Sequence, residues 1–167
     1  ADSSRMSMLY FAIIALASMD QLEAITDDIR IACIEWVYSQ QIVDERLGMS
    51  GFRGGPYMGN KYTIDESSAS CCCLDYSHVT MTHMALSILI MLNDDLKKVR
   101  KDSIINSISS LQQKSGAFSP YYGSNEEDVR FTYSACAISE IFNNWGTIDK
   151  DAIAASILKT WTYDGGF

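Results

Sequence analysis

The sequence contains few of the residues that mark whole classes of protein. It has only 2 prolines and 10 glycines in 167 residues, which excludes collagen-like and low-complexity chains. Basic residues are also scarce, since 13 Lys and Arg stand against 21 Asp and Glu for a net charge of −8. We therefore expect no nucleic-acid partner, because proteins that bind nucleic acids carry clustered positive charge.

Long hydrophobic runs and ordered cysteine patterns are missing too. The run 6–17 is too short to cross a bilayer and is interpreted as a buried helix, so we expect no transmembrane segment. Five cysteines include the consecutive Cys71, Cys72 and Cys73. No C-x-x-C pair or neighbouring histidine completes a zinc site around them. Reduced thiols in a cytoplasmic protein are the expected state.

What the sequence does have is helical pattern. With 47% hydrophobic and 20% charged residues, a folded domain is expected, and the length suits one domain. Helix-favouring segments alternate in character. The first, third and fifth are apolar nearly all round, whereas the second, fourth and sixth are amphipathic. The six predicted helices cover approximately residues 4–18, 26–41, 77–93, 96–113, 126–143 and 149–161.

A short motif recurs along this pattern. The second and fourth segments end in paired glutamines, and each amphipathic segment is followed by a glycine–aromatic turn. The turns are 51–52, 116–118 and 165–167. Their spacing indicates a helical-hairpin repeat of about 50 residues. The first interval is longer, which we attribute to an inserted polar loop over residues 54–73.

Stacked hairpins with a wholly apolar inner layer are best explained by closure into a ring. In an open solenoid, both helix layers would keep a solvent-facing side. We therefore predict an all-α fold, an α/α toroid of alternating inner and outer helices. Residues 1–167 would form a partial barrel domain of three helical hairpins, about half of the toroid, within a longer polypeptide.

Polar residues in the first turns of apolar inner helices are the candidate site, because such residues are costly unless paired or functional. Arg130 could bind a carboxylate or a diphosphate oxygen, or could pair with a neighbouring acidic residue. The candidates for that pairing are Glu126, Glu127 and Asp128. His78 is interpreted as a pocket wall, since its spacing from His83 is wrong for a metal pair. Phe131 and Tyr133 are interpreted as core aromatics in preference to cavity ones, although a cavity role stays open.

Several segments, in order, are similar to the β subunits of protein prenyltransferases, and most of all to geranylgeranyltransferase type I. The resemblance covers nearly the whole chain, and its Arg53 turn and LNDDL element favour type I. The matching segments are GFRGGPYMG at 51–59, DYSHVTMT at 75–82, LNDDL at 92–96, DVRFTY at 128–133 and YDGGF at 163–167.

The resemblance implies specific roles for residues. It places Ser7, Phe11, His78, Thr80 and Phe131 in a pocket for the substrate's C-terminal tail. Arg130 and Tyr133 would face the isoprenoid, its diphosphate and the peptide. It assigns no catalytic residue and no metal ligand to this chain. Three positions depart from the usual pattern: Ser7 stands where Thr is common, Thr80 where Ala is common, and His83 where Tyr is common.

The resemblance also implies an activity. Geranylgeranyl diphosphate would donate its lipid to the cysteine of a CaaX tail, as on Rho-type small GTPases. A partner α subunit would complete the enzyme. Zinc, and possibly magnesium, would serve the whole subunit with ligands outside this chain, so the chain alone should be inactive. A farnesyl- or Rab-type β subunit and a non-catalytic helical-repeat scaffold stay open, while a terpene cyclase ranks low because no DxDD motif is present.

Overall fold

The computed structural model describes residues 4–44, 48–56 and 76–166. Six α-helices and a short 3-10 turn, Leu22–Ala24, are found in these ranges together with two strands. The helices are α1 (Arg5–Ser18), α2 (Asp27–Ser39), α3 (Val79–Met91), α4 (Lys101–Ser110), α5 (Val129–Phe142) and α6 (Lys150–Leu158), and the strands are β1 (Gln41–Asp44) and β2 (Met49–Phe52). The predicted helix order is confirmed.

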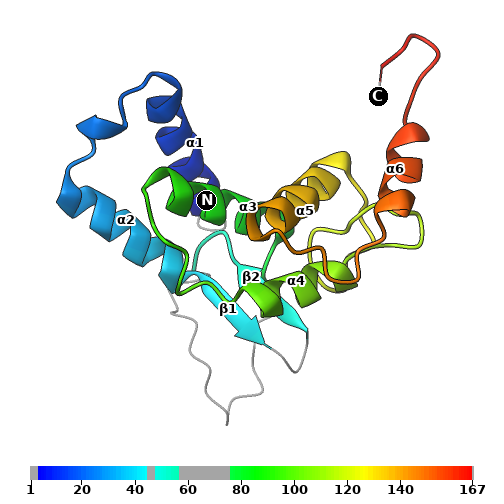
Figure 1. The fold of residues 1–167 in the computed structure, drawn as a ribbon, viewed down its shortest axis with the longest axis horizontal. Coiled ribbons are helices and arrows are strands. Elements are labelled where there is room, and N and C mark those ends of the chain that lie inside the picture. The colour runs from blue at the N-terminus through cyan, green and yellow to red at the C-terminus, as the bar shows by residue number, and fades with distance from the viewer. Residues whose placement is uncertain (1–3, 45–47, 57–75, 167) are drawn as a thin grey trace.

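The helices form two layers. In the inner row α1 packs on α3, and α3 packs on α5. Figure 1 shows these three helices in chain order across the upper side of the fold, with α2, the strands and α4 below them and α6 at the right. This is the alternation of inner and outer helices that the sequence predicted.

The inner layer is covered best at its centre, along α3. In α3, Val79, Ala85, Leu86, Ile88 and Leu89 are all buried, and Ile90 near its C-terminal end is the exposed large hydrophobic residue of this helix. In contrast, α1 leaves Met8 and Phe11 exposed, and α5 leaves Tyr133 exposed. The expectation that all three inner helices are covered on every side is therefore wrong within the described residues: it fails for α1 and α5, and at Ile90 also for α3.

The small β-hairpin was not predicted. The sequence analysis extended the second helix to Gln41, but this residue begins β1 and pairs with Phe52 of β2 in an antiparallel register. The β-branched residues Ile42 and Val43 favour a strand at this point. The fourth helix also starts later than expected, at Lys101. Leu96, with a φ of +56°, lies in the left-handed region before it.

Most of the predicted inserted loop, residues 57–73, lies outside the described residues. Its beginning is placed. The carbonyl oxygen of Gly54 accepts a hydrogen bond of 2.8 Å from the backbone N–H of Met6 in the first turn of α1. Arg53 is buried, and its Nε donates to Oε1 of Gln40 at 3.1 Å. The residues that follow the hairpin therefore contact the first turn of the inner helix α1.

The repeat is visible in the backbone pairing after each outer helix. Gln41 pairs with Phe52 inside the hairpin, and Gln112 forms an isolated antiparallel bridge with Phe118. Both phenylalanine side chains are fully buried. The first repeat reaches this arrangement through a strand pair and the second through a tight turn. The paired glutamines and glycine–aromatic turns noted in the sequence are thus structurally equivalent.

Each inner helix ends in the same way. One residue adopts a left-handed conformation, and the next backbone N–H bonds to a carbonyl five residues earlier, which is the Schellman arrangement. The left-handed residues are Asp20, Asn93 and Asn143, with φ of 57°, 61° and 48°. The closing hydrogen bonds run from Gln21 to Leu16, from Asp94 to Leu89 and from Asn144 to Ser139, at 2.8, 2.9 and 3.0 Å. Asn and Asp tolerate this conformation better than other non-glycine residues.

Candidate functional site

The predicted site residues of the third and fifth segments gather at the first turns of α3 and α5. Both helices begin at a side-chain N-cap, which satisfies an otherwise unpaired backbone N–H. His78 caps α3 by accepting from the N–H of Thr80, and Asp128 caps α5 by accepting from the N–H of Arg130. Because α3 packs on α5, the two capped ends lie next to each other.

The start of α3 is held by two further loops. The N–H of His78 donates to the carbonyl oxygen of Phe52 at 3.1 Å, and the N–H of Val79 donates to that of Pro120 at 2.9 Å. In the next turn, Thr82 Oγ1 accepts from the N–H of Phe52 at 2.9 Å. The glycine–aromatic turns therefore fix the positions of the site residues on α3.

His78 is the centre of this group. Its Nδ1 accepts from the Thr80 N–H at 3.2 Å, so in the neutral ring the proton lies on Nε2. Burial lowers the pKa of His78 to about 4, which keeps the imidazole neutral at physiological pH. Its ring meets the Phe131 ring edge-to-face, with centroids 5.7 Å apart. This places a neutral N–H donor within an aromatic surrounding.

Phe131 and Arg130 lie on α5 beside the imidazole. Phe131 is buried, so the alternative that it belongs to the core is realised. Arg130 is exposed, and its guanidinium carbon lies 6.0 Å from the centre of the Phe131 ring. Its Nε and Nη2 donate to the two carboxylate oxygens of Asp128 at 2.9 and 2.8 Å. The predicted ion pair is therefore formed, with Asp128 as the partner.

This ion pair determines the ionisation of Asp128 at the start of α5. The Arg130 guanidinium and its backbone N–H hold the pKa of Asp128 at about 2. Asp128 therefore stays ionised and serves both as the helix cap and as the anchor of the guanidinium. Since the guanidinium has five N–H donors, an anion could still bind at its remaining edge.

Thr80 joins the same surface from α3. Its Oγ1 lies 3.5 Å from Oγ of Ser134 on α5, and the Ser134 hydroxyl donates to the carbonyl oxygen of Arg130 at 2.8 Å. Thr80 thus contacts α5 one turn beyond the Arg130 position. Its N–H also donates to His78, so Thr80 lies next to the imidazole at the start of α3.

The predicted residues of α1 are placed less centrally. Ser7 donates to the sulfur of Met81 at 3.4 Å, which connects it to α3 beside Thr80. Phe11 is 60% exposed, and its ring lies 5.6 Å from that of Tyr10. No ring contact in the described residues joins Phe11 to His78 or Phe131. Ser7 therefore borders the group, whereas Phe11 lies apart from it.

Tyr133, one turn after Arg130 on α5, makes a different contact. It is 64% exposed, so the core alternative does not hold for this residue. Its ring meets His83 edge-to-face at 5.2 Å. Burial lowers the pKa of His83, which is therefore also neutral at physiological pH. The two histidines of α3 thus support two different aromatic contacts with α5.

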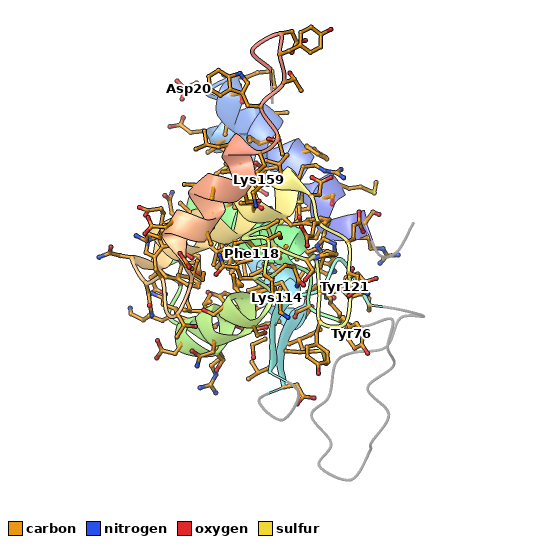
Figure 2. The ribbon with its side chains drawn as sticks, turned by 90° about the vertical axis from the view of Figure 1, so that its right-hand side faces the viewer. Asp20, Tyr76, Lys114, Phe118, Tyr121 and Lys159 are labelled. Carbon is orange, nitrogen blue, oxygen red and sulfur yellow. The ribbon has the colours of Figure 1, made fainter. Side chains whose placement is uncertain are left out.

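Two residues of this surface were not picked out as site residues by the sequence analysis. Tyr121 lies with its ring centre 6.1 Å from that of His78 and 6.0 Å from that of Tyr76. Figure 2 shows Tyr76 and Tyr121 close together on one side of the fold. Tyr76 belongs to the matching segment 75–82 but was given no role of its own. Residues 119–125 lie between two predicted helices, and their sequence indicates no contact for Tyr121.

The described residues offer no place for the implied zinc or magnesium. Within 4–44, 48–56 and 76–166, no group of three or more His, Cys, Asp or Glu side chains could hold a metal ion. Cys71, Cys72 and Cys73 lie outside the described ranges. In the part of the chain that the structure describes, no helix is both long and apolar enough for a membrane span.

Comparison with known families agrees with this architecture. The whole chain, residues 1–167, matches the family of the prenyltransferase alpha-alpha toroid domain. The protein therefore belongs to that family, and the predicted α/α toroid fold is confirmed.

Two curated relatives narrow the resemblance. The chain is 33% identical over 175 residues to the geranylgeranyl transferase type-1 subunit beta of Dictyostelium discoideum. The matched region covers 98% of this chain and 49% of that protein. It is 30% identical over 172 residues to the subunit of the same name from Arabidopsis thaliana, covering 98% of this chain and 44% of that protein. The chain thus spans about half the length of these relatives.

Proposed function

We propose that this chain forms part of the β subunit of a protein geranylgeranyltransferase type I. The enzyme would transfer the lipid of geranylgeranyl diphosphate to the cysteine of a C-terminal CaaX tail, as on Rho-type small GTPases, and would act with an α subunit in the cytoplasm. The observation that carries the proposal is the convergence of His78, Thr80, Phe131 and Arg130 at the first turns of α3 and α5. The two type-1 relatives support the same reading.

The chemistry of this group suits the tail of a peptide. The neutral His78 offers a ring that carries no charge, and the buried Phe131 ring supports it edge-to-face. An apolar side chain can be buried against such a surface without desolvating an ion. The Nε2–H of His78 remains able to donate to a carbonyl or carboxylate oxygen of the peptide.

Arg130 suits the diphosphate end of the donor. In the transfer, the thiolate sulfur of the substrate forms a bond to the first carbon of the isoprenoid, and the carbon–oxygen bond to diphosphate breaks. The electron pair leaves with the diphosphate. A guanidinium near the leaving group would stabilise this developing charge. Asp128 holds the guanidinium in place through two hydrogen bonds while leaving other donors available.

No step is assigned to a metal ion. The zinc and the magnesium implied by the resemblance find no ligand set within the described residues. We propose that zinc serves the whole subunit through other residues of the enzyme.

A transfer assay tests the proposal. The complete polypeptide that contains these residues would be expressed with a prenyltransferase α subunit and given labelled geranylgeranyl or farnesyl diphosphate with tails ending in Leu or Met. We expect geranylgeranyl transfer to the tail ending in Leu. Farnesyl transfer to the tail ending in Met would instead support a farnesyl-type subunit, transfer only to intact Rab proteins would support a Rab-type subunit, and no transfer at all would support a non-catalytic scaffold.

A further inference from the structure

The loop between α4 and α5 brings a tyrosine against the centre of the proposed site. This loop is fixed at its beginning. The N–H of Ser119 donates to the carbonyl oxygen of Leu111 at 3.1 Å, and the carbonyl oxygen of Pro120 accepts from the N–H of Val79 at 2.9 Å. Tyr121 follows immediately, and its own carbonyl oxygen accepts from the N–H of Ser124 at 3.2 Å. The backbone on both sides of Tyr121 is therefore held.

The Tyr121 ring lies between two other rings. Its centre is 6.1 Å from that of His78 and 6.0 Å from that of Tyr76, with interplanar angles of 47° and 37°. These separations are within the range at which aromatic pairs attract. Because His78 also contacts Phe131, a continuous aromatic series runs from Tyr76 through Tyr121 and His78 to Phe131.

Part of the Tyr121 side chain remains open. Tyr121 is 37% exposed, whereas Phe131 at the other end of the series is buried. A partly exposed ring that contacts His78 can also contact whatever lies against His78. The neighbouring Tyr122 is 54% exposed and makes no ring contact within the described residues, so it lacks this connection.

We propose that Tyr121 is a specificity-determining residue of the tail pocket, forming the wall beside His78 that limits the size of the apolar side chain accepted there. This inference rests on the proposed function and adds to it a residue from the loop between α4 and α5. With the tyrosine in place, the space next to the imidazole is narrowed by a second ring besides that of Phe131. A branched aliphatic side chain such as leucine is favoured over a larger aromatic one.

Steady-state kinetics of the complete β subunit with its α subunit tests this inference. The substrates are two otherwise identical CaaX peptides that end in Leu or in Phe. Tyr121→Ala should raise kcat/KM for the Phe peptide relative to the Leu peptide by about fivefold or more, because overpacking a site costs about 1 kcal/mol or more and the truncation relieves it. The change should lie in KM, with kcat at saturating peptide within about twofold of the wild type.

Two variants serve as controls. Tyr121→Phe keeps the ring and should keep the wild-type ratio, and Tyr122→Ala removes a neighbouring exposed ring and should also keep it. Tyr121→Leu provides a second truncation in case the alanine variant folds poorly, as judged by its thermal unfolding.

The outcomes separate the two claims. A wild-type enzyme that uses neither peptide overturns the proposed function and this inference with it. An active wild type whose peptide ratio is unchanged by both Tyr121→Ala and Tyr121→Leu overturns the inference alone. An equal change in Tyr122→Ala would also overturn it, because the effect would then not depend on contact with His78.

Discussion

Gln41 and Gln112 make the same pair of hydrogen bonds one repeat apart. The Gln41 side chain donates to the carbonyl oxygen of Lys98 and accepts from the N–H of Arg100, at 3.1 and 3.0 Å. The Gln112 side chain donates to the carbonyl oxygen of Asp149 and accepts from its N–H, both at 2.9 Å. Each glutamine therefore ties the end of one outer helix to the beginning of the next.

Replacing either glutamine should loosen this connection. Since a net hydrogen bond contributes about 1 kcal/mol, Gln112→Ala should lower the free energy of unfolding by about 1–2 kcal/mol in urea titrations of the full-length protein. Gln112→Glu keeps the acceptor but loses the donor, so its free energy of unfolding should lie between those of the wild type and the alanine variant. Equal stability of the alanine variant and the wild type would contradict the role of the paired hydrogen bonds.

Gly116 should tolerate no side chain. Its φ is +91°, and a Cβ there would lie 2.0 Å from the carbonyl oxygen of Ala152 in α6. Gly116→Ala should therefore destabilise the protein by about 3 kcal/mol or more, as backbone strain and a steric clash combine. Gly123 has a similar φ of +83° but open space around it. Gly123→Ala is the matched control and should cost only about 1–2 kcal/mol. Thermal unfolding of both variants measures the difference, and similar losses would refute the clash.

Thr82 should be sensitive to loss of its hydroxyl. Oγ1 accepts from the N–H of Phe52 and donates to the carbonyl oxygen of His78, at 2.9 and 3.0 Å. Thr82→Val keeps the shape but leaves a buried N–H without an acceptor, which costs about 1–3 kcal/mol. Thr82→Ser retains the hydroxyl and should lose less. If chemical denaturation ranks the serine variant below the valine variant, packing rather than hydrogen bonding determines stability here.

Stability should decline as pH falls from about 6.5 towards 4. His78 has an ordinary pKa of 6.5 and a folded-state pKa of about 4. Between these values the unfolded chain binds a proton that the folded chain does not, so the free energy of unfolding rises with pH at up to about 1.4 kcal/mol per pH unit. The contribution is complete above pH 6.5. Burial also lowers the pKa of His83, which adds a slope of the same sign.

His78→Asn isolates the contribution of His78. Asparagine can still cap α3 but does not titrate. Urea unfolding at several pH values should give a shallower slope for this variant than for the wild type. His83→Phe, which keeps a ring beside Tyr133, should leave the share of the pH slope that is due to His78 unchanged. Parallel pH curves for the wild type and His78→Asn would show that burial of His78 does not shift its pKa.

Asp128 should contribute to stability as a helix cap more than as half of an ion pair. Its ion pair with Arg130 is largely exposed, and exposed pairs contribute little. Asp128→Asn keeps the capping acceptor and should change stability by less than about 0.5 kcal/mol, whereas Asp128→Ala should cost about 1 kcal/mol. Differential scanning calorimetry distinguishes the two. If the asparagine variant is as unstable as the alanine variant, the stabilising contribution of Asp128 depends on its charge and not on its capping hydrogen bond.

Helix order could be predicted from the sequence because it depends on local pattern. The apolar residues of α3 and the alternation with amphipathic segments predict helices regardless of how these helices pack in the tertiary structure. The hairpin could not be predicted in the same way. Ile42 and Val43 are only two residues of strand character, and what completes the sheet is a partner segment, 49–52, whose own sequence resembles a turn.

The site was predictable to the extent that it lies in first turns of inner helices. His78 and Arg130 were found this way, because polar residues in apolar helices stand out, whereas the pocket roles of Thr80 and Phe131 came from the family resemblance. Tyr121 was missed because it lies in a loop. Its position depends on the hydrogen bond between Val79 and Pro120, a contact between distant residues that hydrophobic periodicity does not predict. The choice of Asp128 over Glu126 or Glu127 likewise depended on helix-cap geometry.

The cap at the start of α3 has a consequence for what His78 can recognise. Its Nδ1 lone pair is committed to the Thr80 N–H, so any guest at the ring meets an N–H and no free lone pair. A guest that presents an oxygen acceptor satisfies this edge, whereas an amine or ammonium group does not. The helix cap therefore fixes the hydrogen-bonding character of the free imidazole edge as that of a donor.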